Sequence, residues 1–174
     1  PVGKPTNTVL SDYHQNIEVF VGNGCNQDSM KIDGVLEIGD HPSHVSTLRI
    51  SPSSTLHITK RGQLIIGPNS RLIIEKGATL FIEPGARIEW NEGTIELSGS
   101  LELTNGASFK PDGKGSIYIK EGAEIIQRQG GMIVLSESLL LIDGDLIVPS
   151  STSLFSLDFC TITLMNKHTA HINA

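Results

Sequence analysis

Five segments between residues 47 and 82 share one order of polar and apolar positions. In every segment the second residue is Leu and the fourth is Ile, while the first is polar. The segments are residues 47–50, 55–58, 63–66, 71–74 and 79–82. An alternation with a period of two predicts β-strands with one buried face, and the spacing does not fit a helix.

Four turn-forming residues separate each segment from the next. These quartets, such as 67–70 and 83–86, are rich in Pro, Gly, Ser and Asn. Such residues either hold φ at about −65° or permit a positive φ, so they turn the chain. A four-residue strand cannot bury a core alone. We therefore predict an all-β parallel β-solenoid, in which each strand pairs with the equivalent strand one turn away.

Two arrangements of the repeated unit remain open. Three units of eight residues make about 24 residues per turn and a triangular cross-section, as in right-handed β-helices, and we prefer this arrangement. However, Pro52, Pro68 and Pro84 recur every sixteen residues, with Lys60 and Lys76 in the alternate turns. That period favours a two-sided solenoid, which would stack Pro68 over Pro52.

The extent of the repeats divides the chain into an array and two ends. We expect one domain over residues 1–174, with the repeat array at 31–149. The open ends of a solenoid expose unpaired strand edges, which terminal segments usually cover. Residues 1–30 are therefore predicted to form an N-terminal cap, and 150–174 the last rung and a C-terminal tail.

The composition and charge of the chain exclude some classes of binding partner. A formal charge of −6 and a pI near 5.4 argue against a nucleic-acid partner, because phosphate binding needs clustered Lys and Arg. No apolar run approaches the roughly 20 residues that span a bilayer. With about 4.8 Å per turn, five turns would place Cys25 and Cys160 about 25 Å apart, so two unpaired thiols are expected.

The third position of each unit should face solvent and be polar. Several units break this rule, and the apolar residues at these positions form our candidate interaction patch: Ile65, Ile73, Phe81, Ile126, Val134 and Leu141. A large apolar cluster on the surface is usually buried against another part of the chain or a binding partner. A terminal segment or long loop of the chain, another subunit or domain, and a ligand are the three alternatives.

Three outward carboxylates could do chemistry if stacking brought them together. Glu89, Glu96 and Glu102 occupy successive units, and paired carboxylates serve as acid and base in β-helix hydrolases. Successive units lie on different faces, however, so these side chains should diverge. We predict solvated surface and no catalytic residue.

Two pairs of histidines are candidate ligands for a metal ion. His41 and His44, and likewise His168 and His171, are three residues apart, and Asp40 could add a third ligand to the first pair. No Cys or carboxylate cluster completes either set. We therefore predict no metal and no cofactor.

Three segments of the repeat array resemble those of a known family. Residues 74–80, 82–88 and 119–125 each place Gly-Ala between an acidic turn residue and an apolar strand. They resemble the β-helix repeats of large secreted or surface proteins of bacteria, most closely those of Bacteroidota exported by the type IX system. The resemblance spans about residues 31–148, and it implies a secreted or cell-surface location. Repeats of this kind serve as stalks, adhesins and polysaccharide-degrading domains.

From these observations we expect a non-enzymatic structural or adhesive module, acting as a rigid spacer or binding scaffold. The alternatives are a carbohydrate-active β-helix enzyme and a subunit of a self-assembling fibre. The expected partners are other domains of a larger protein, another subunit or a surface polysaccharide. Neither nucleic acid nor a membrane span is expected.

Overall fold

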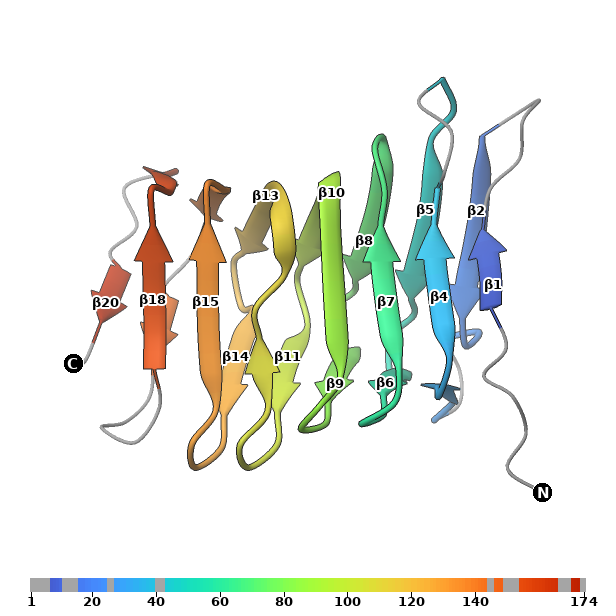
Figure 1. Ribbon diagram of the computed structural model, residues 1–174, viewed down its shortest axis with the longest axis horizontal. Helices are drawn as coiled ribbons and strands as arrows, with labels where there is room; N and C mark the ends of the chain where they lie inside the picture. The colour runs from blue at the N-terminus through green and yellow to red at the C-terminus, as the bar shows by residue number, and fades with distance from the viewer. Residues whose placement is uncertain are drawn as a thin grey trace.

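The structure of the protein is a computed structural model that describes residues 7–10, 16–24, 27–39, 43–143, 146–148, 154–165 and 170–172. These residues form an all-β parallel β-solenoid and contain no helix (Figure 1). The predicted fold class is therefore confirmed. The array makes about five turns.

Successive strands occupy three faces in rotation. Face 1 consists of β1 (Asn7–Leu10), β4 (Val35–Ile38), β7 (Gln63–Ile66), the first part of β10 (Arg87–Leu97), β12 (Ser108–Phe109), the first part of β13 (Asp112–Lys120), β15 (Met132–Ser136) and β18 (Leu154–Asp158). Face 2 consists of β2 (Ile17–Val21), β5 (Ser46–Ile50), β8 (Ser70–Ile74), the second parts of β10 and β13, β16 (Leu139–Asp143) and β19 (Thr161–Leu164). Face 3 consists of β3 (Ser29–Ile32), β6 (Thr55–Ile58), β9 (Thr79–Ile82), β11 (Ser100–Leu103), β14 (Glu124–Gln127), β17 (Leu146–Val148) and β20 (Ala170–Ile172).

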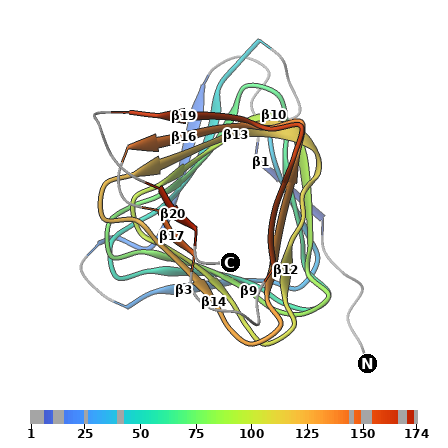
Figure 2. The ribbon, with the colours of Figure 1, turned by 90° about the vertical axis from the view of Figure 1, so that its left-hand side faces the viewer.

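The register shows how many units make one turn. Thr55 pairs with Thr79, 24 residues further along the chain, in parallel orientation. The view along the axis shows the resulting three-sided outline (Figure 2). The two-sided alternative is wrong, because the neighbour of the Pro52 turn is the Lys76 turn: the amide of Ser53 donates to the carbonyl of Gly77 at 3.0 Å. The right-handed wind stays a prediction, supported by the general handedness of parallel crossovers.

The core lies inside the three faces and consists of stacked side chains. On face 2, register aligns Leu48, Leu72 and Ile95, and all three are buried. Near the middle of the rod the largest core side chains, Trp90 and Phe109, meet with ring centroids 6.4 Å apart. The stacking of equivalent residues explains why Leu and Ile recur in every unit.

The ends continue the same ladders. β1, β2 and β3 pair in parallel with β4, β5 and β6, while β18 and β19 pair with β15 and β16. The described parts of both ends therefore form turns of the solenoid. The capping role of residues 1–30, and the tail after the last rung, stay predictions.

Candidate functional site

The outward charges of face 2 are joined from turn to turn. Arg49 lies between two carboxylates of neighbouring turns: its Nη2 is 2.6 Å from Oε1 of Glu18, and its Nη1 is 3.0 Å from Oε1 of Glu75. Partial burial acts to lower the pKa of the Arg49 guanidinium, but the hydrogen bonds to both carboxylates outweigh it and raise this pKa. The guanidinium therefore stays charged and connects three turns.

Glu96 occupies the equivalent bridging position further along the same face. Its Oε2 is 2.7 Å from Nζ of Lys120, and its Oε1 accepts a hydrogen bond from Arg71. Burial of the side chain, only 10% exposed, acts to raise the pKa of Glu96. The hydrogen bonds from Lys120 and Arg71 outweigh burial, so the pKa lies below its ordinary value.

Face 3 carries a histidine between turns. His57 Nε2 lies 2.8 Å from Oε1 of Glu83, and its ring meets Phe81 edge-on at a centroid distance of 4.8 Å. Glu83 also accepts a hydrogen bond from the backbone amide of Lys60 at 2.9 Å. That amide, followed by His57, lowers the pKa of the Glu83 carboxyl. These contacts again connect neighbouring turns.

The three carboxylates considered for catalysis diverge, as predicted. Glu89 lies on face 1, Glu96 on face 2 and Glu102 on face 3. Each is engaged by a residue of a neighbouring turn: Gln63 donates to Glu89, and Nε of Arg128 donates to Glu102 at 2.8 Å. The three side chains therefore do not form one active site.

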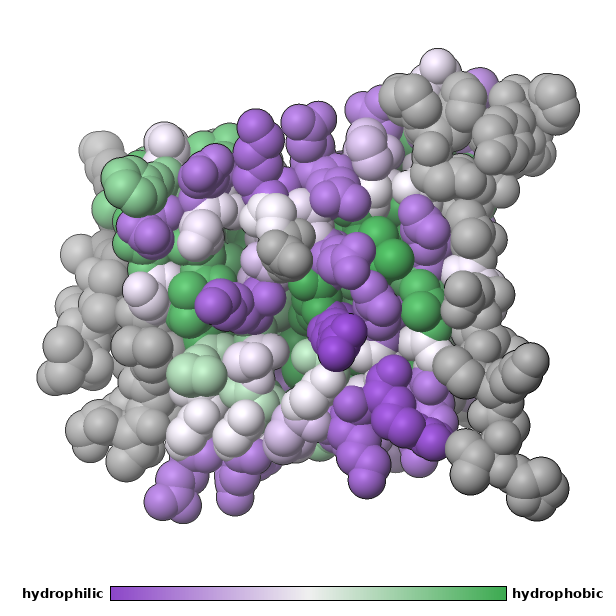
Figure 3. Space-filling view, in the orientation of Figure 1, coloured by the Kyte–Doolittle hydropathy of each residue, from purple (hydrophilic) through white to green (hydrophobic). Residues whose placement is uncertain are grey.

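The residues of the candidate interaction patch do not come together either. Two lie on each face: Ile65 and Val134 on face 1, Ile73 and Leu141 on face 2, Phe81 and Ile126 on face 3. On face 3, Glu102 separates the two, because it pairs with Phe81 on one side and Ile126 on the other. In the side view, apolar areas are interrupted by polar side chains (Figure 3). A role of these residues in binding stays a prediction.

A hollow with both polar and apolar walls lies at the corner between faces 1 and 2. Its volume is about 510 Å³, and its walls include Pro68, Asn91, Glu92, Lys114 and Glu137 from successive turns. The hollow offers an amide, two carboxylates and one ammonium group, which suit a ligand rich in hydroxyl groups. The Trp90 ring is fully buried and donates its Nε1 proton to the carbonyl of Gly93 at 2.7 Å, so it offers no exposed stacking platform here.

Sequence reasoning missed this hollow because its residues lie about one turn apart in the chain. The corner has one left-handed residue in each of several turns: Asn69, Glu92, Gly113, Glu137 and Phe159, with φ between 49° and 104°. Asn and Gly adopt this conformation easily, but Glu and Phe do so at a cost of about 1–2 kcal/mol each. No local motif predicts this conformation at Glu or Phe.

A second hollow lies on face 2 at the end nearer the N-terminus. Its volume is about 430 Å³, and Asn16, Thr47, Arg49, Arg71 and Ile73 contribute to its walls. Both arginines already form ion pairs with Glu18, Glu75 or Glu96. Their charges are therefore largely neutralised within the chain.

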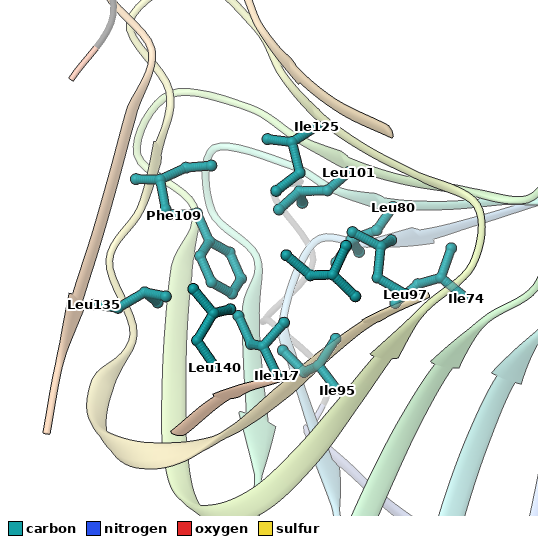
Figure 4. A pocket seen from close by; sticks show the side chains of 12 residues that line it. Ile74, Leu80, Ile95, Leu97, Leu101, Phe109, Ile117, Ile125, Leu135 and Leu140 are labelled. Atoms are coloured by element: carbon teal, nitrogen blue, oxygen red, sulfur yellow. The ribbon is translucent and has the colours of Figure 1, made fainter. Parts of the chain in front are cut away.

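The interior contains a small void around Phe109, close to Ile117, Leu135 and Leu140 (Figure 4). Its volume is about 20 Å³, and every residue lining it is apolar. A buried water needs about two to four polar partners, which these walls lack. The void is a packing defect and not a ligand site.

The candidate metal ligands fall mainly outside the described residues. His41, Asp40 and His168 lie there, as do the side chain of His171 and all of Cys25. In the parts of the chain that the structure describes, no group of three His, Cys, Asp or Glu side chains could hold a metal ion. Cys160 is a free, half-buried thiol. None of the described residues forms a helix long and apolar enough to cross a membrane.

No family model, curated protein or solved structure matches this chain.

Proposed function

We propose that this chain is a non-enzymatic structural module of a secreted or cell-surface protein, acting as a rigid spacer or binding scaffold. The observation that carries the proposal is the use of the outward carboxylates. Glu18, Glu75, Glu96 and Glu102 each bind a cation of a neighbouring turn, so these charges join the rod together. Carboxylates held in this way are poor candidates for acid and base.

Stiffness follows from the continuity of the bonding. Every turn of the array pairs in parallel with the next, and the same Leu and Ile columns stack through the core. A local bend would have to break backbone hydrogen bonds and ion pairs on at least one face. Such a rod suits a part that holds other domains apart or presents a binding surface at a distance.

The carbohydrate-active enzyme is the weaker alternative. Such an enzyme needs two carboxyl groups flanking one glycosidic bond, about 5 to 9.5 Å apart. The outward carboxylates Glu89, Glu96 and Glu102 lie on three faces. The corner hollow does hold Glu92 and Glu137. Its amide, carboxylate and ammonium groups can form hydrogen bonds with the hydroxyl groups of a polysaccharide, which supports a scaffold that binds glycan without cleaving it.

The experiment that tests the proposal incubates the protein with neutral and acidic polysaccharides and measures new reducing ends and retention on immobilised glycan. We expect no new reducing ends with any substrate. Cleavage that is lost in Glu92→Gln or Glu137→Gln would overturn the non-enzymatic proposal.

Retention without cleavage would identify the adhesive form. In that case Lys114→Ala in the corner hollow should reduce retention at least tenfold. The matched control is Lys76→Ala, at an exposed turn of another corner, which should retain glycan like the wild type. Absence of both cleavage and retention would favour the spacer.

A further inference from the structure

Three charged side chains of the corner hollow, Glu92, Lys114 and Glu137, form no ion pair with any residue that the structure describes. On the faces, by contrast, Glu96 and Glu102 each pair with a cation of a neighbouring turn. The two carboxylates and the ammonium group of the hollow therefore keep their hydrogen-bonding capacity for a ligand.

A glycine in the middle turn opens the hollow. Glu92 and Glu137 occupy left-handed corner positions two turns apart, and the turn between them has Gly113 at this position. A Cβ on Gly113 would lie 2.2 Å from the carbonyl oxygen of Trp90, so no side chain can fill the gap. At about 4.8 Å per turn, the two glutamates flank a gap about 10 Å long along the solenoid axis.

The floor of the hollow is held in place by packing. Between Asn91 and Thr94, β10 has one residue more than the facing segment of β13, which makes a β-bulge. Such bulges redirect side chains and are common beside binding sites. The Trp90 ring lies buried at the bulge, fixed by its hydrogen bond to the Gly93 carbonyl. A site on such a floor needs little reorganisation when a ligand binds.

The size of the hollow suits a short stretch of a polysaccharide. Its volume of about 510 Å³ lies within the range of about 300–1,000 Å³ that is usual for ligand sites. Its walls come from successive turns along an exposed corner, so a glycan chain can lie in it along the axis.

The charges around the hollow disfavour an acidic sugar. Its two carboxylates outnumber its one ammonium group. Asp158 of the next turn adds a further carboxylate nearby, because the Glu137 amide donates to the Asp158 carbonyl at 3.0 Å. A uronate or sulfate group would therefore meet more negative than positive charge.

We propose that the corner hollow binds a neutral polysaccharide, with the glycan chain along the solenoid axis, and discriminates against acidic glycans. Glu92 and Glu137 accept hydrogen bonds from sugar hydroxyl groups, and Lys114 and Asn91 donate to sugar oxygens between them. This inference rests on the binding-scaffold form of the proposed function, to which it adds the class of glycan.

The test compares retention of the protein on immobilised neutral polysaccharides with retention on their oxidised forms. Glucan, mannan and galactan are each paired with a form whose primary hydroxyl groups have been converted to carboxylates. We expect at least one neutral polysaccharide to be retained, and its oxidised form to bind at least about tenfold more weakly at low ionic strength. Added salt should narrow this difference, because salt screens the repulsion.

Removing the two carboxylates should abolish the discrimination and keep the binding. In Glu92→Gln/Glu137→Gln the amide oxygens still accept hydrogen bonds, so the neutral and oxidised forms should bind within about threefold of each other. The matched control is Glu121→Gln/Glu124→Gln, which removes two exposed carboxylates at another corner. This control should discriminate like the wild type.

Oxidised forms that bind as tightly as the neutral ones, or more tightly, would overturn the inference. So would an equal effect of the two double variants, which would assign the discrimination to the net charge of the whole protein. Retention of no neutral polysaccharide would overturn it as well and leave the spacer form of the proposed function standing. New reducing ends, measured in the same samples, would instead overturn the non-enzymatic function, so the two failures are distinguishable.

Discussion

Glu96 shows how a single outward residue contributes to the solenoid. Its carboxylate is largely shielded from solvent and bridges Arg71 of the preceding turn and Lys120 of the following one. The folded protein holds its pKa below the ordinary value of 4.5. A carboxyl with a lowered pKa stabilises the fold above its ordinary pKa, and this contribution is lost as the pH falls through the lower, folded value.

We predict that Glu96→Gln lowers the free energy of unfolding by about 1.5–3 kcal/mol at pH 7, the range for hydrogen bonds to charged groups. Urea denaturation followed by circular dichroism measures this change. The difference from the wild type should shrink as the pH falls well below 4.5. Glu121→Gln, at an exposed turn position, is the matched control and should change stability little. A loss equal to that of Glu121→Gln would contradict the bridging role.

At the scale of the element, each strand separates a buried side from an outward side. In β7, Leu64 is fully buried, whereas its neighbour Ile65 points outward and is half-buried. Leu64 lies in a core column between Leu36 and Ile88. Ile65 lies between Glu37 and Glu89 on the surface.

Alanine substitutions at these two adjacent positions should therefore lower the free energy of unfolding by very different amounts. Leu64→Ala removes buried methyl groups and leaves a cavity, which should cost about 2–5 kcal/mol. Ile65→Ala should cost about 1 kcal/mol, because half of that side chain is already in water. Thermal and urea unfolding of both variants measure the difference. Equal costs would show that β7 does not have one buried face in solution.

The corner of β13 depends on a missing side chain. A Cβ on Gly115 would lie 1.9 Å from Nε1 and 2.1 Å from Cε2 of Trp90. Trp90 is fully buried and hydrogen-bonded to the Gly93 carbonyl, so its ring cannot move aside freely. Gly at this position therefore permits the corner to close over the indole.

We predict that Gly115→Ala destabilises the protein by about 1–3 kcal/mol, the usual cost of overpacking. In a double-mutant cycle, Trp90→Phe supplies the smaller ring. The two losses should be less than additive, because the smaller ring leaves room for the added methyl group. If the losses of stability caused by Gly115→Ala and Trp90→Phe are additive, the added methyl group does not clash with the indole ring.

For the whole molecule, the ion pairs between turns make stability depend on pH in one direction. Asp33 accepts hydrogen bonds from Arg61 and Thr59, and these bonds lower its pKa. The pKa values of Glu83 and Glu96 are lowered as well. In all three cases the unfolded chain binds the proton more tightly than the folded one, so acid favours unfolding.

We predict that the urea midpoint stays nearly constant from pH 7 to pH 5 and falls as the pH drops below the ordinary carboxyl values of 3.8 for Asp and 4.5 for Glu. A urea titration at each pH measures this dependence. Concentrated salt at pH 7 should reduce the free energy of unfolding only slightly, because water already weakens the exposed ion pairs and little of their attraction is left for salt to screen. A midpoint that rises on acidification would contradict the role of these pairs.

The sequence alone determined the strands, their buried sides and the parallel solenoid. Its alternation of polar residues with Leu and Ile is local, and burial of one strand face follows from it directly. Even the divergence of Glu89, Glu96 and Glu102 followed from counting units along the chain. Three short units that bury one face each can form a core only by winding round an axis.

Only the tertiary structure decided which residues meet between turns. The residue spacing of one turn varies, from 21 between Thr79 and Ser100 to 29 between Ile17 and Ser46, because corners differ in length. The sixteen-residue proline period suggested two sides, but prolines at different corners need not stack. The contact of Arg71 with Glu96 and the corner hollow depend on these accumulated spacings, which no local pattern encodes.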